Sequence, residues 1–547
     1  MLKILTILLM VTACSNAGEK SGEQIFIRVN QQGFNTDDYK SAVVLSNIDL
    51  QGKRFFVVDK IGDVEVYSDF ISKKLRKYAD FNFVYEIEFS DVKESGKYYL
   101  QIEGITSPVF SVGKNVYSSF ASDMLEFFKV QRCGYTNPEL HNVCHIADVT
   151  ELVDKNGRRK EKFDVTGGWH DAGDYTKFVN TTAFSTYMLL FAYDFAPQRF
   201  SFDNNRNNVP DILEEAKIGL DWLLRANYHN KELITQVQDE KDQSVGWRMP
   251  EKDPLQFDRP GFLGIGKNLI GIYVAALALG SRIWKETINF PEFSIKLKET
   301  AETFYSLKNT VDDIDTTGTG FYRDKHYSGK LALAAIEMYL LTKDEKYLTD
   351  AENYGRDAGP EAWWGWGNVA ALADYKIARF NPDFTELLKK SLEKFAEHSK
   401  KKDFGECVDL YWGSNMNLLG ASLINILYER LTKDNSFDKM ATINRDYILG
   451  RNPWGISFIY DKGENYVKHF HHQVAFFNSG KLPGALSGGP VMKSVYGDLK
   501  IKYLENDRYV NFQTDSSYYR DDRNDYVCNE PTISANATAI FVFGMIK

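Results

Sequence analysis

The chain has 547 residues, of which 43% are hydrophobic and 26% are charged, and its formal net charge is −9 at pH 7. This length is enough for two or three domains, and the composition is that of an ordinary globular protein. The negative charge argues against nucleic acid or an anionic membrane surface as a partner, and it favours a neutral ligand over a polyanion.

Residues 1–22 are predicted to be a lipoprotein signal peptide followed by a short tether. Lys3 precedes a brief apolar run, which is typical of a secretory signal and too short to span a bilayer. The run ends in Val11-Thr12-Ala13-Cys14, which resembles a bacterial lipoprotein box with Cys14 as the acylated residue. The alternative is an ordinary signal peptide with an incidental cysteine. We therefore expect a lipid-anchored protein of the cell envelope, at the outer membrane and on its periplasmic or surface face.

Residues 23–114 are predicted to form a small all-β domain. Short runs of β-branched and aromatic residues follow one another between Gln24 and Gly113, separated by Gly, Asn, Asp or Ser. A segment of this length and pattern is typical of an antiparallel sandwich. No aromatic platform in it demands a ligand site of its own, so we expect it to pack on the rest of the chain.

The hydrophobic period becomes helical after Tyr117. Pro210 before Asp211, and Pro291 before Glu292, mark helix starts. Twelve amphipathic stretches without strands between them predict a mainly α domain over 115–547, built as a toroid of six helical hairpins, an (α/α)6 barrel. The predicted helices lie near 117–131, 181–196, 210–227, 267–285, 292–308, 328–342, 345–357, 368–380, 384–400, 416–432, 437–449 and 532–546.

A set of cysteines and histidines lies between the first two predicted helices. Cys133, the adjacent pair Cys144-His145, and His170 together offer two thiolates and two imidazoles, which is a closed donor set for structural zinc. The alternative is a disulfide between Cys133 and Cys144, with the histidines serving elsewhere. The remaining cysteines, Cys407 and Cys528, are interpreted as buried small apolar residues.

Two carboxylates stand three positions apart directly after this set. Asp171 and Asp174 are separated by Ala172 and Gly173, which let the backbone turn tightly and come close to a ligand, and Tyr175 adds a flat apolar face. Two acids held together in a cleft can position and deprotonate one water. The alternative is a surface turn, since these residues also favour turns.

A third acid, Glu530, stands near the far end of the chain. It ends a long segment, 451–531, that has little helical pattern, and it directly precedes the last apolar helix. A carboxyl at such an edge is partly desolvated, which raises its pKa and keeps it protonated near neutrality. One protonated acid and one acid pair are the components of an inverting glycosidase, in which the two carboxyls lie roughly 6.5–9.5 Å apart.

Several aromatic and polar residues are candidates for the lining of such a cleft. Tryptophans can stack on sugar rings, although each is equally suited to a packed core. Arg248 and Asp239 are further candidates, and the run from His469 to Gln473 is either a ligand-binding segment, a solvated loop or a metal cluster. The candidate tryptophans are Trp247, Trp412, Trp454 and the cluster Trp363-Trp364-Gly365-Trp366.

The acidic segments together resemble the signatures of glycoside hydrolase family 9. The run Trp169–Asp174 is similar to the catalytic-base segment of that family, and Tyr519–Ala537 is similar to its catalytic-acid segment. The opening Val29–Phe34 resembles the immunoglobulin-like module that precedes many catalytic domains of the family. The resemblance extends from about residue 23 to the end of the chain, and the other matching motifs are Asn208–Glu215, Trp412–Asn415 and Asp446–Pro453.

The resemblance implies a role for each matching residue. It implies that Asp174 is the general base, that Asp171 helps to hold the water and that Glu530 is the general acid. It also implies that His471 hydrogen-bonds the sugar. Gln473 stands where the family usually has arginine, which puts the substrate contacts in doubt and leaves the acid–base chemistry untouched. Some members carry zinc at positions matching the Cys/His set, and calcium occurs in relatives, although no calcium ligands are identifiable in this sequence.

The sequence as a whole predicts an inverting hydrolase of β-1,4-glucosidic bonds, with no cofactor in catalysis. We expect a monomeric endo-β-1,4-glucanase acting on cellulose, mixed-linkage glucan or xyloglucan, with Trp247, Trp412, Tyr175, His471 and Gln473 contacting the substrate. One alternative, prompted by Gln473, is an exo-acting β-glucosidase or glucosaminidase on short oligosaccharides. Another is a surface glycan-binding lipoprotein without catalysis.

Overall fold

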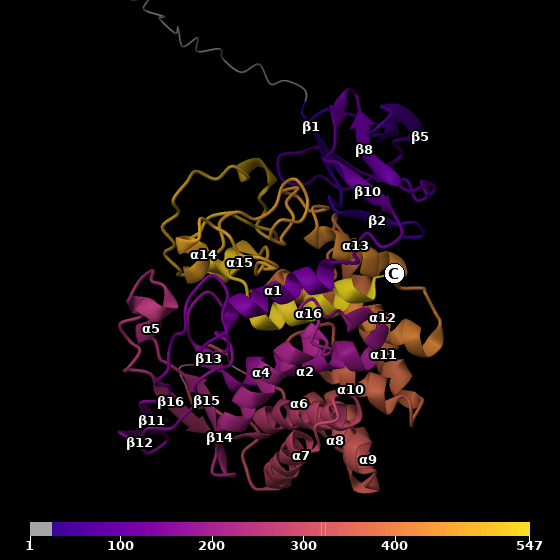
Figure 1. The fold of residues 1–547 in the computed structure, drawn as a ribbon. Helices are drawn as coiled ribbons and strands as arrows, with labels where there is room; N and C mark the ends of the chain where they lie inside the picture. Colours follow the sequence, from indigo (N-terminus) through magenta and orange to yellow (C-terminus); the bar gives the residue numbers. More distant parts are fainter. Residues whose placement is uncertain (1–23, 319, 323, 547) are drawn as a thin grey trace, which may run out of the picture.

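The computed structural model describes residues 24–318, 320–322 and 324–546 of the chain. A small β-sandwich sits against one side of a larger helical domain (Figure 1). The predicted fold, an (α/α)6 barrel preceded by an immunoglobulin-like sandwich, is confirmed. Cys14 and the rest of the predicted leader lie outside the described residues. No helix in the described part of the chain is long and apolar enough to span a bilayer.

The sandwich consists of two sheets with strand orders β1-β3-β7-β6 and β2-β10-β8-β4-β5, and β9 pairs with β8. Phe34, Phe89 and Phe110 hold the space between the sheets, with ring centroids 5.5 Å apart in each pair. The strands are β1 (Ile25–Arg28), β2 (Gly33–Asn35), β3 (Ser41–Ser46), β4 (Arg54–Asp59), β5 (Val64–Phe70), β6 (Lys73–Lys74), β7 (Phe83–Glu88), β8 (Gly96–Ile102), β9 (Ile105–Thr106) and β10 (Phe110–Gly113).

All twelve predicted helices are present, and they form two concentric rings. Each inner helix contacts the next, and the contact between α16 and α2 closes the circle. The inner helices are α2 (Val179–Phe195), α6 (Lys267–Glu286), α8 (Ser328–Thr342), α10 (Ala370–Ile377), α12 (Ser414–Thr432) and α16 (Ile533–Met545). The outer helices are α1 (Phe120–Gln131), α4 (Asp211–Arg225), α7 (Pro291–Ser306), α9 (Glu345–Ala358), α11 (Asp383–Ser399) and α13 (Asp438–Ile448).

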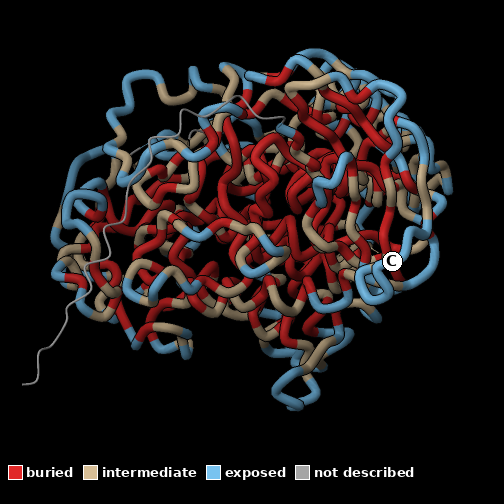
Figure 2. The backbone as a smooth tube through the Cα atoms, turned by 90° about the horizontal axis from the view of Figure 1, so that it is seen from above, coloured by how far each residue is buried: buried red, intermediate tan, exposed pale blue. Residues whose placement is uncertain are grey.

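Burial differs between the rings, and this difference explains their sequences. In outer α9 only Tyr347, Ala351 and Gly355 are buried, four residues apart on one face, which is the amphipathic pattern. Inner α16 is buried along nearly its whole length and is therefore apolar on every side. Viewed from above, the buried stretches fill the interior of the molecule and the exposed ones follow its outline (Figure 2).

The expectation that no strands lie between the helices is wrong. The connections among α1, α2, α4 and α6 form a six-stranded sheet of order β12-β11-β16-β15-β13, with β14 beside β15. These strands are short and pair across long sequence separations, so no periodic hydrophobic pattern in the local sequence indicates them. They are β11 (Glu151–Asp154), β12 (Gly157–Arg159), β13 (Lys177–Phe178), β14 (Asn227–Tyr228), β15 (Glu232–Val237) and β16 (Pro260–Gly264).

Buried polar contacts join the sandwich to the helical domain. The Arg451 Nη2 atom lies 3.1 Å from Glu86 Oε1 of β7, and both side chains are almost fully buried. Asn30 Nδ2 donates to Asp446 Oδ1 of α13 at 2.7 Å. Because buried charges are tolerated only in fixed pairs, these contacts hold the two domains in one arrangement, as the predicted packing role of the sandwich requires.

Candidate active site

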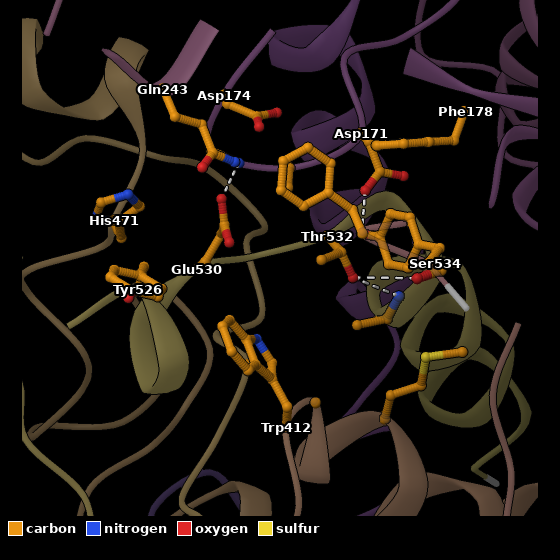
Figure 3. Close-up of a pocket in the computed structure, with 18 of the residues that line it drawn as sticks. Asp171, Asp174, Phe178, Gln243, Trp412, His471, Tyr526, Glu530, Thr532 and Ser534 are labelled. Carbon is orange, nitrogen blue, oxygen red and sulfur yellow. Dashed lines mark hydrogen bonds between the residues drawn. The ribbon is translucent and has the colours of Figure 1, made fainter. Parts of the chain in front are cut away.

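A cavity of about 1130 Å³ opens where the N-terminal ends of five inner helices converge. Its lining comes from the residues just before or at the starts of α2, α8, α10, α12 and α16, together with the loop that contains α5 (Lys241–Ser244) and the irregular segment before α15 (Tyr526–Asn529). The barrel therefore presents loop residues into one hollow. Figure 3 shows some of the side chains that line it.

The three predicted catalytic acids meet in this cavity (Figure 3). Gly173, which lies between Asp171 and Asp174, donates its backbone N–H to Glu530 Oε1 at 3.1 Å across 357 sequence positions. A Cβ atom at Gly173 would lie 2.1 Å from the carbonyl oxygen of His471 and 3.1 Å from Glu530 Oε1. Only glycine lets the turn approach so closely, which explains the residue between the two aspartates.

Asp171 is fully buried at the base of the cavity and accepts hydrogen bonds from the hydroxyls of Thr181 and Tyr322. Its carbonyl oxygen accepts the backbone N–H of Ile533, the first residue of α16, at 3.0 Å. Burial raises the pKa of the Asp171 carboxyl to about 6, against the opposing effect of the two hydroxyls. Asp171 is thus held by two inner helices, by Thr181 of α2 and by Ile533 of α16.

Asp174 and Glu530 both line the cavity and titrate differently from free carboxyls. Burial raises the pKa of Asp174 to about 7, with further contributions from the charges of Asp242 and Asp171, while the backbone N–H and hydroxyl of Thr176 oppose the shift. Burial, followed by the charge of Asp174, raises the pKa of Glu530 well above its usual range. One carboxyl that stays protonated and one that ionises near neutrality form an acid–base pair.

Four of the five predicted substrate contacts line the cavity: Trp247, Trp412, His471 and Gln473. His471 Nδ1 donates to the Arg523 carbonyl oxygen at 2.8 Å, so Nδ1 carries the proton, and burial lowers the pKa of the imidazole. Trp247 packs edge-on against His471 at 5.0 Å between ring centroids. Trp412 leaves 52% of its surface exposed, which makes a flat apolar surface available at the cavity mouth.

Gln473 is held by the backbone of the loop opposite. Its Oε1 atom accepts the N–H of Arg248 at 3.0 Å, and its own N–H donates to the Gly173 carbonyl at 3.0 Å. Since the amide oxygen is engaged, the amide nitrogen is the group left to donate toward a ligand. The residue that stands in place of the expected arginine is therefore still a donor, although a neutral one.

The structure does not place the other candidates in the cavity, with the exception of the tryptophan cluster Trp363, Trp364 and Trp366. Tyr175 is 1% exposed and packs against the rings of His145 and His170, because the turn after Asp174 directs it inward. Tyr175 is therefore not among the residues that line the cavity. Trp454, Arg248 and Asp239 are likewise buried and bonded to protein groups.

The predicted Cys/His set is assembled beneath the acid pair. The ligand atoms of Cys133, Cys144, His145 and His170 all lie within 4.8 Å of one another, and all four residues are buried. The two sulfurs are 3.9 Å apart, so the cysteines are free thiols, in contrast to the ~2.05 Å of a disulfide. By its donor chemistry and its closeness, the set could hold a metal ion, and it is called the metal-binding group below.

Comparison with known proteins agrees with this geometry. Residues 117–543 match the family described as glycosyl hydrolase family 9, and residues 23–107 match the cellulase N-terminal ig-like domain. The chain belongs to glycoside hydrolase family 9.

Two relatives and one solved structure cover most of this family 9 chain at low identity. A cellodextrinase of Butyrivibrio fibrisolvens is 27% identical over 95% of this chain and 99% of its own length. Endoglucanase D of Acetivibrio thermocellus is 27% identical over 89% of this chain and 81% of its own length. The crystal structure of a metagenome-derived glycoside hydrolase family 9 endoglucanase superposes with a TM-score of 0.81 at 24% identity, covering 95% of this chain and 99% of that one.

Three residues of this family 9 site were not anticipated from the sequence: Tyr322, Asp242 and Tyr526. Tyr322 donates to Asp171, Asp242 lies beside Asp174, and Tyr526 packs near both His471 and Trp412. Tyr526 lies four positions before Glu530 and could have been found from that spacing. No pattern in the local sequence singles out Tyr322 or Asp242, because their neighbours in space come from distant segments.

Proposed function

We propose that this family 9 enzyme hydrolyses β-1,4-glucosidic bonds with inversion at the anomeric carbon. The observation that carries the proposal is the meeting of Glu530 and the Asp171/Asp174 turn through the Gly173 N–H. Protonated Glu530 gives its proton to the glycosidic oxygen as the bond to the anomeric carbon breaks. Asp174 takes a proton from the water that attacks that carbon, and Asp171 helps to orient the water.

The aromatic lining of the cavity supports cleavage within a chain. An exposed pair, Tyr411 and Trp412, stands at the mouth, and Trp363, Trp366 and Trp247 lie deeper, so several sugar rings have apolar surfaces to stack on. The second candidate is exo-action on short oligosaccharides, which the neutral donor Gln473 and the likeness to a cellodextrinase favour. Early products of several lengths support endo-action, and early monosaccharide alone supports exo-action.

The decisive variants are Glu530→Gln and Asp174→Asn, which keep the shape of each side chain and remove its proton chemistry. Each should lower kcat on a soluble β-1,4-glucan by at least about 10²-fold, the range of a lost general acid or base. Proton NMR of the fresh product should show the inverted anomer. Near-normal turnover in either variant, or a retained anomer, contradicts the assigned roles. Binding of glucan without any hydrolysis by the wild type would instead favour a non-catalytic lipoprotein.

We further propose that Cys133, Cys144, His145 and His170 hold a structural zinc ion. For tetrahedral zinc, the usual bond lengths place two sulfurs ~3.8 Å apart, sulfur and nitrogen ~3.6 Å apart and two nitrogens ~3.3 Å apart. The separations here are 3.9 Å for the sulfurs, 3.8 and 3.9 Å for two sulfur–nitrogen pairs and 3.2 Å for the nitrogens. Four protein ligands leave no open position, so such an ion would clamp the fold and take no part in the reaction.

The zinc proposal has a direct test. Metal analysis of the purified protein should give one zinc per chain. A strong chelator should remove it and lower Tm, and added zinc should restore Tm. Absence of zinc, or a Tm that does not respond to its removal, would contradict the proposal.

We also propose that the protein is exported as a monomer and anchored to the cell envelope through an acylated Cys14. The signal-like residues before Cys14 support this, together with the polar tether after it. Cys14→Ser should move the enzyme from the membrane to the soluble fraction and abolish incorporation of labelled palmitate. Unchanged membrane association would contradict the anchor, and light scattering of the released protein tests the monomer.

A further inference from the structure

A layer of paired charges lies directly beneath the Asp171/Asp174 turn. It contains three carboxylates and three cations, each at most 7% exposed. Its pairs include Arg259 with Asp148 at 2.5 Å, Lys177 with Asp148 at 2.7 Å, and Arg248 with Asp242 at 2.7 Å. Buried charges of this kind are costly unless their geometry is fixed. The members are Asp148, Asp242, Asp253, Lys177, Arg248 and Arg259.

An unbroken series of contacts runs through this layer from the metal-binding group to the acid pair. His145 Nε2 lies 3.1 Å from Asp253 Oδ2, and the same carboxylate oxygen accepts from Arg248 Nη2 at 3.0 Å. Arg248 Nη2 also donates to Asp242 Oδ1 at 2.7 Å. Asp242 Oδ2 in turn accepts the backbone N–H of Tyr175, the residue after Asp174, at 3.2 Å.

Arg248 occupies the middle of this series and reaches the cavity on a second side. Its guanidinium lies 5.0 Å from the centroid of the Tyr175 ring, and its backbone N–H donates to Gln473 Oε1. The guanidinium Nη1 atom donates to the carbonyls of Asp242 and Gly246, which shape the loop opposite the acid pair. The Arg248 side chain thus contacts three parts of the site: the carboxylate that bonds His145, the ring of Tyr175 and the carbonyls of the loop that precedes Arg248.

We propose that Arg248 is a positioning residue that couples the metal-binding group to the catalytic base Asp174 through Asp253 on one side and Asp242 on the other. The inference rests on the proposed roles of Asp174 and of the Cys/His group. Its physical reason is the tolerance of catalysis to displacement, since a shift of the base by 1 Å costs about 10²-fold in rate. The metal group therefore holds the turn at both ends, directly at His170 and indirectly at Tyr175.

The guanidinium is needed because its planar set of N–H donors bonds the carboxylates of Asp253 and Asp242 and two backbone carbonyls at the same time. Arg248→Lys keeps the charge but cannot serve both carboxylates and both carbonyls. We expect kcat to fall about 10-fold or more, whereas KM changes less than about threefold because Gln473 is bonded to a main-chain N–H. Zinc affinity, measured by competition with a chromophoric chelator, should also fall, because Asp253 loses the partner that orients it against His145.

The coupling itself is measured with the neutral isosteres Asp253→Asn and Asp242→Asn. Asp253→Asn should lower kcat even at saturating zinc with full occupancy, although Asp253 lies outside the cavity. Asp242→Asn should lower kcat as well. Because Asp253 and Asp242 belong to one series of contacts joined by Arg248, the double variant should lose much less than the product of the two single losses. Independent, multiplicative losses would overturn the inference.

A matched control separates positioning from stability. Arg282 also bridges two carboxylates, the partly buried Asp194 at 2.8 Å and the buried Glu337 at 3.7 Å, but it lines neither the cavity nor the Cys/His group. Arg282→Lys should lower Tm and leave kcat and zinc affinity unchanged. If Arg248→Lys likewise lowers Tm but leaves kcat and zinc affinity unchanged, the inference is wrong. Asp174→Asn in the same assay tests the proposed function separately. If this variant remains active, the proposed function is wrong, independently of the result for Arg248→Lys.

Discussion

At the scale of single residues, catalysis depends on surroundings that disfavour ionised Asp174. Burial and the nearby charges of Asp242 and Asp171 raise its pKa to about 7, while the backbone N–H and the hydroxyl of Thr176 donate to it. A carboxylate that is held in such a place is a stronger base than a solvated one. The same surroundings make ionised Asp174 a cost to the folded state.

This cost predicts a pH-dependent gain in stability from Asp174→Asn. The folded-state pKa of about 7 lies above the ordinary value, so the contribution of Asp174 to stability is fully present below pH ~4 and is lost as the pH rises through 7. At pH 8 the neutral asparagine should therefore be more stable than wild type, on the order of 1 kcal/mol or more. The gain should be absent at pH 4.

Urea unfolding at the two pH values checks this prediction. The control is Asp221→Asn, because Asp221 is a half-exposed partner of Lys217 on the surface of α4. Its effect should stay within about 0.5 kcal/mol at both pH values. A gain for Asp174→Asn that is the same at pH 4 and pH 8 would show that the charge of Asp174 is not its source.

The same pKa predicts the acidic limb of the activity profile. As the pH falls below about 7, Asp174 takes up a proton and can no longer accept one from water, so kcat/KM should decline with an apparent pKa near 7. Burial raises the pKa of Glu530 well above its usual range, so Glu530 should keep its proton to a higher pH than a solvated carboxyl does. A profile on a soluble oligosaccharide that stays flat down to pH 4 contradicts this account.

At the scale of elements, the turn at Gly173 joins the start of the barrel domain to its end. Its carbonyl accepts from Gln473, its N–H donates to Glu530, and a side chain there would overlap the His471 carbonyl. Gly173→Ala must therefore move the acid pair away from Glu530. We expect kcat to fall by about 10²-fold and stability by about 1–3 kcal/mol.

Gly365→Ala is the matched control for this substitution. Gly365 also lines the cavity, but an added Cβ would meet only ordinary contacts, the nearest being the Met416 Cε atom at 3.6 Å. Its kinetics, measured on the same substrate, should stay within a few fold of wild type. Equal losses in the two alanine variants would mean that glycine in general, and not the approach at Gly173, sets the activity.

The elements also show what the sequence could and could not predict. All twelve helices were predicted, because a periodic pattern over ten or more residues reflects the buried face directly. The sheet was missed because a pairing such as Glu151 with Pro260 joins short segments far apart in the chain. The acids Asp171, Asp174 and Glu530 were identified from motifs. Asp242 and Tyr322 were not identified, since only the tertiary fold brings them to the acids. Tyr175 was expected in the cavity but lies outside its lining, because a turn has no periodic pattern that indicates which side chains are buried.

At the scale of the whole molecule, buried ion pairs at the domain junction should make the sandwich part of one folding unit. Arg451→Met leaves Glu86 without its cationic partner from the barrel, and breaking a buried pair costs about 3–5 kcal/mol. We expect calorimetry to show a lower Tm for the complete enzyme. Arg76→Met is the control, because Arg76 pairs with Asp403 across the same junction while 65% of its side chain is exposed. Its effect should be within about 1 kcal/mol, and equal effects would argue against a buried origin.

The contact of α16 with α1, α2 and α12 gives the order of translation a consequence of its own. During synthesis the other eleven helices leave the ribosome first, and the apolar sides of α2 and α12 remain uncovered. The proton donor Glu530 directly precedes this last helix. A nascent chain that lacks Glu530 and α16 therefore exposes apolar helix surfaces and has no proton donor. We expect it to need a chaperone most at that stage.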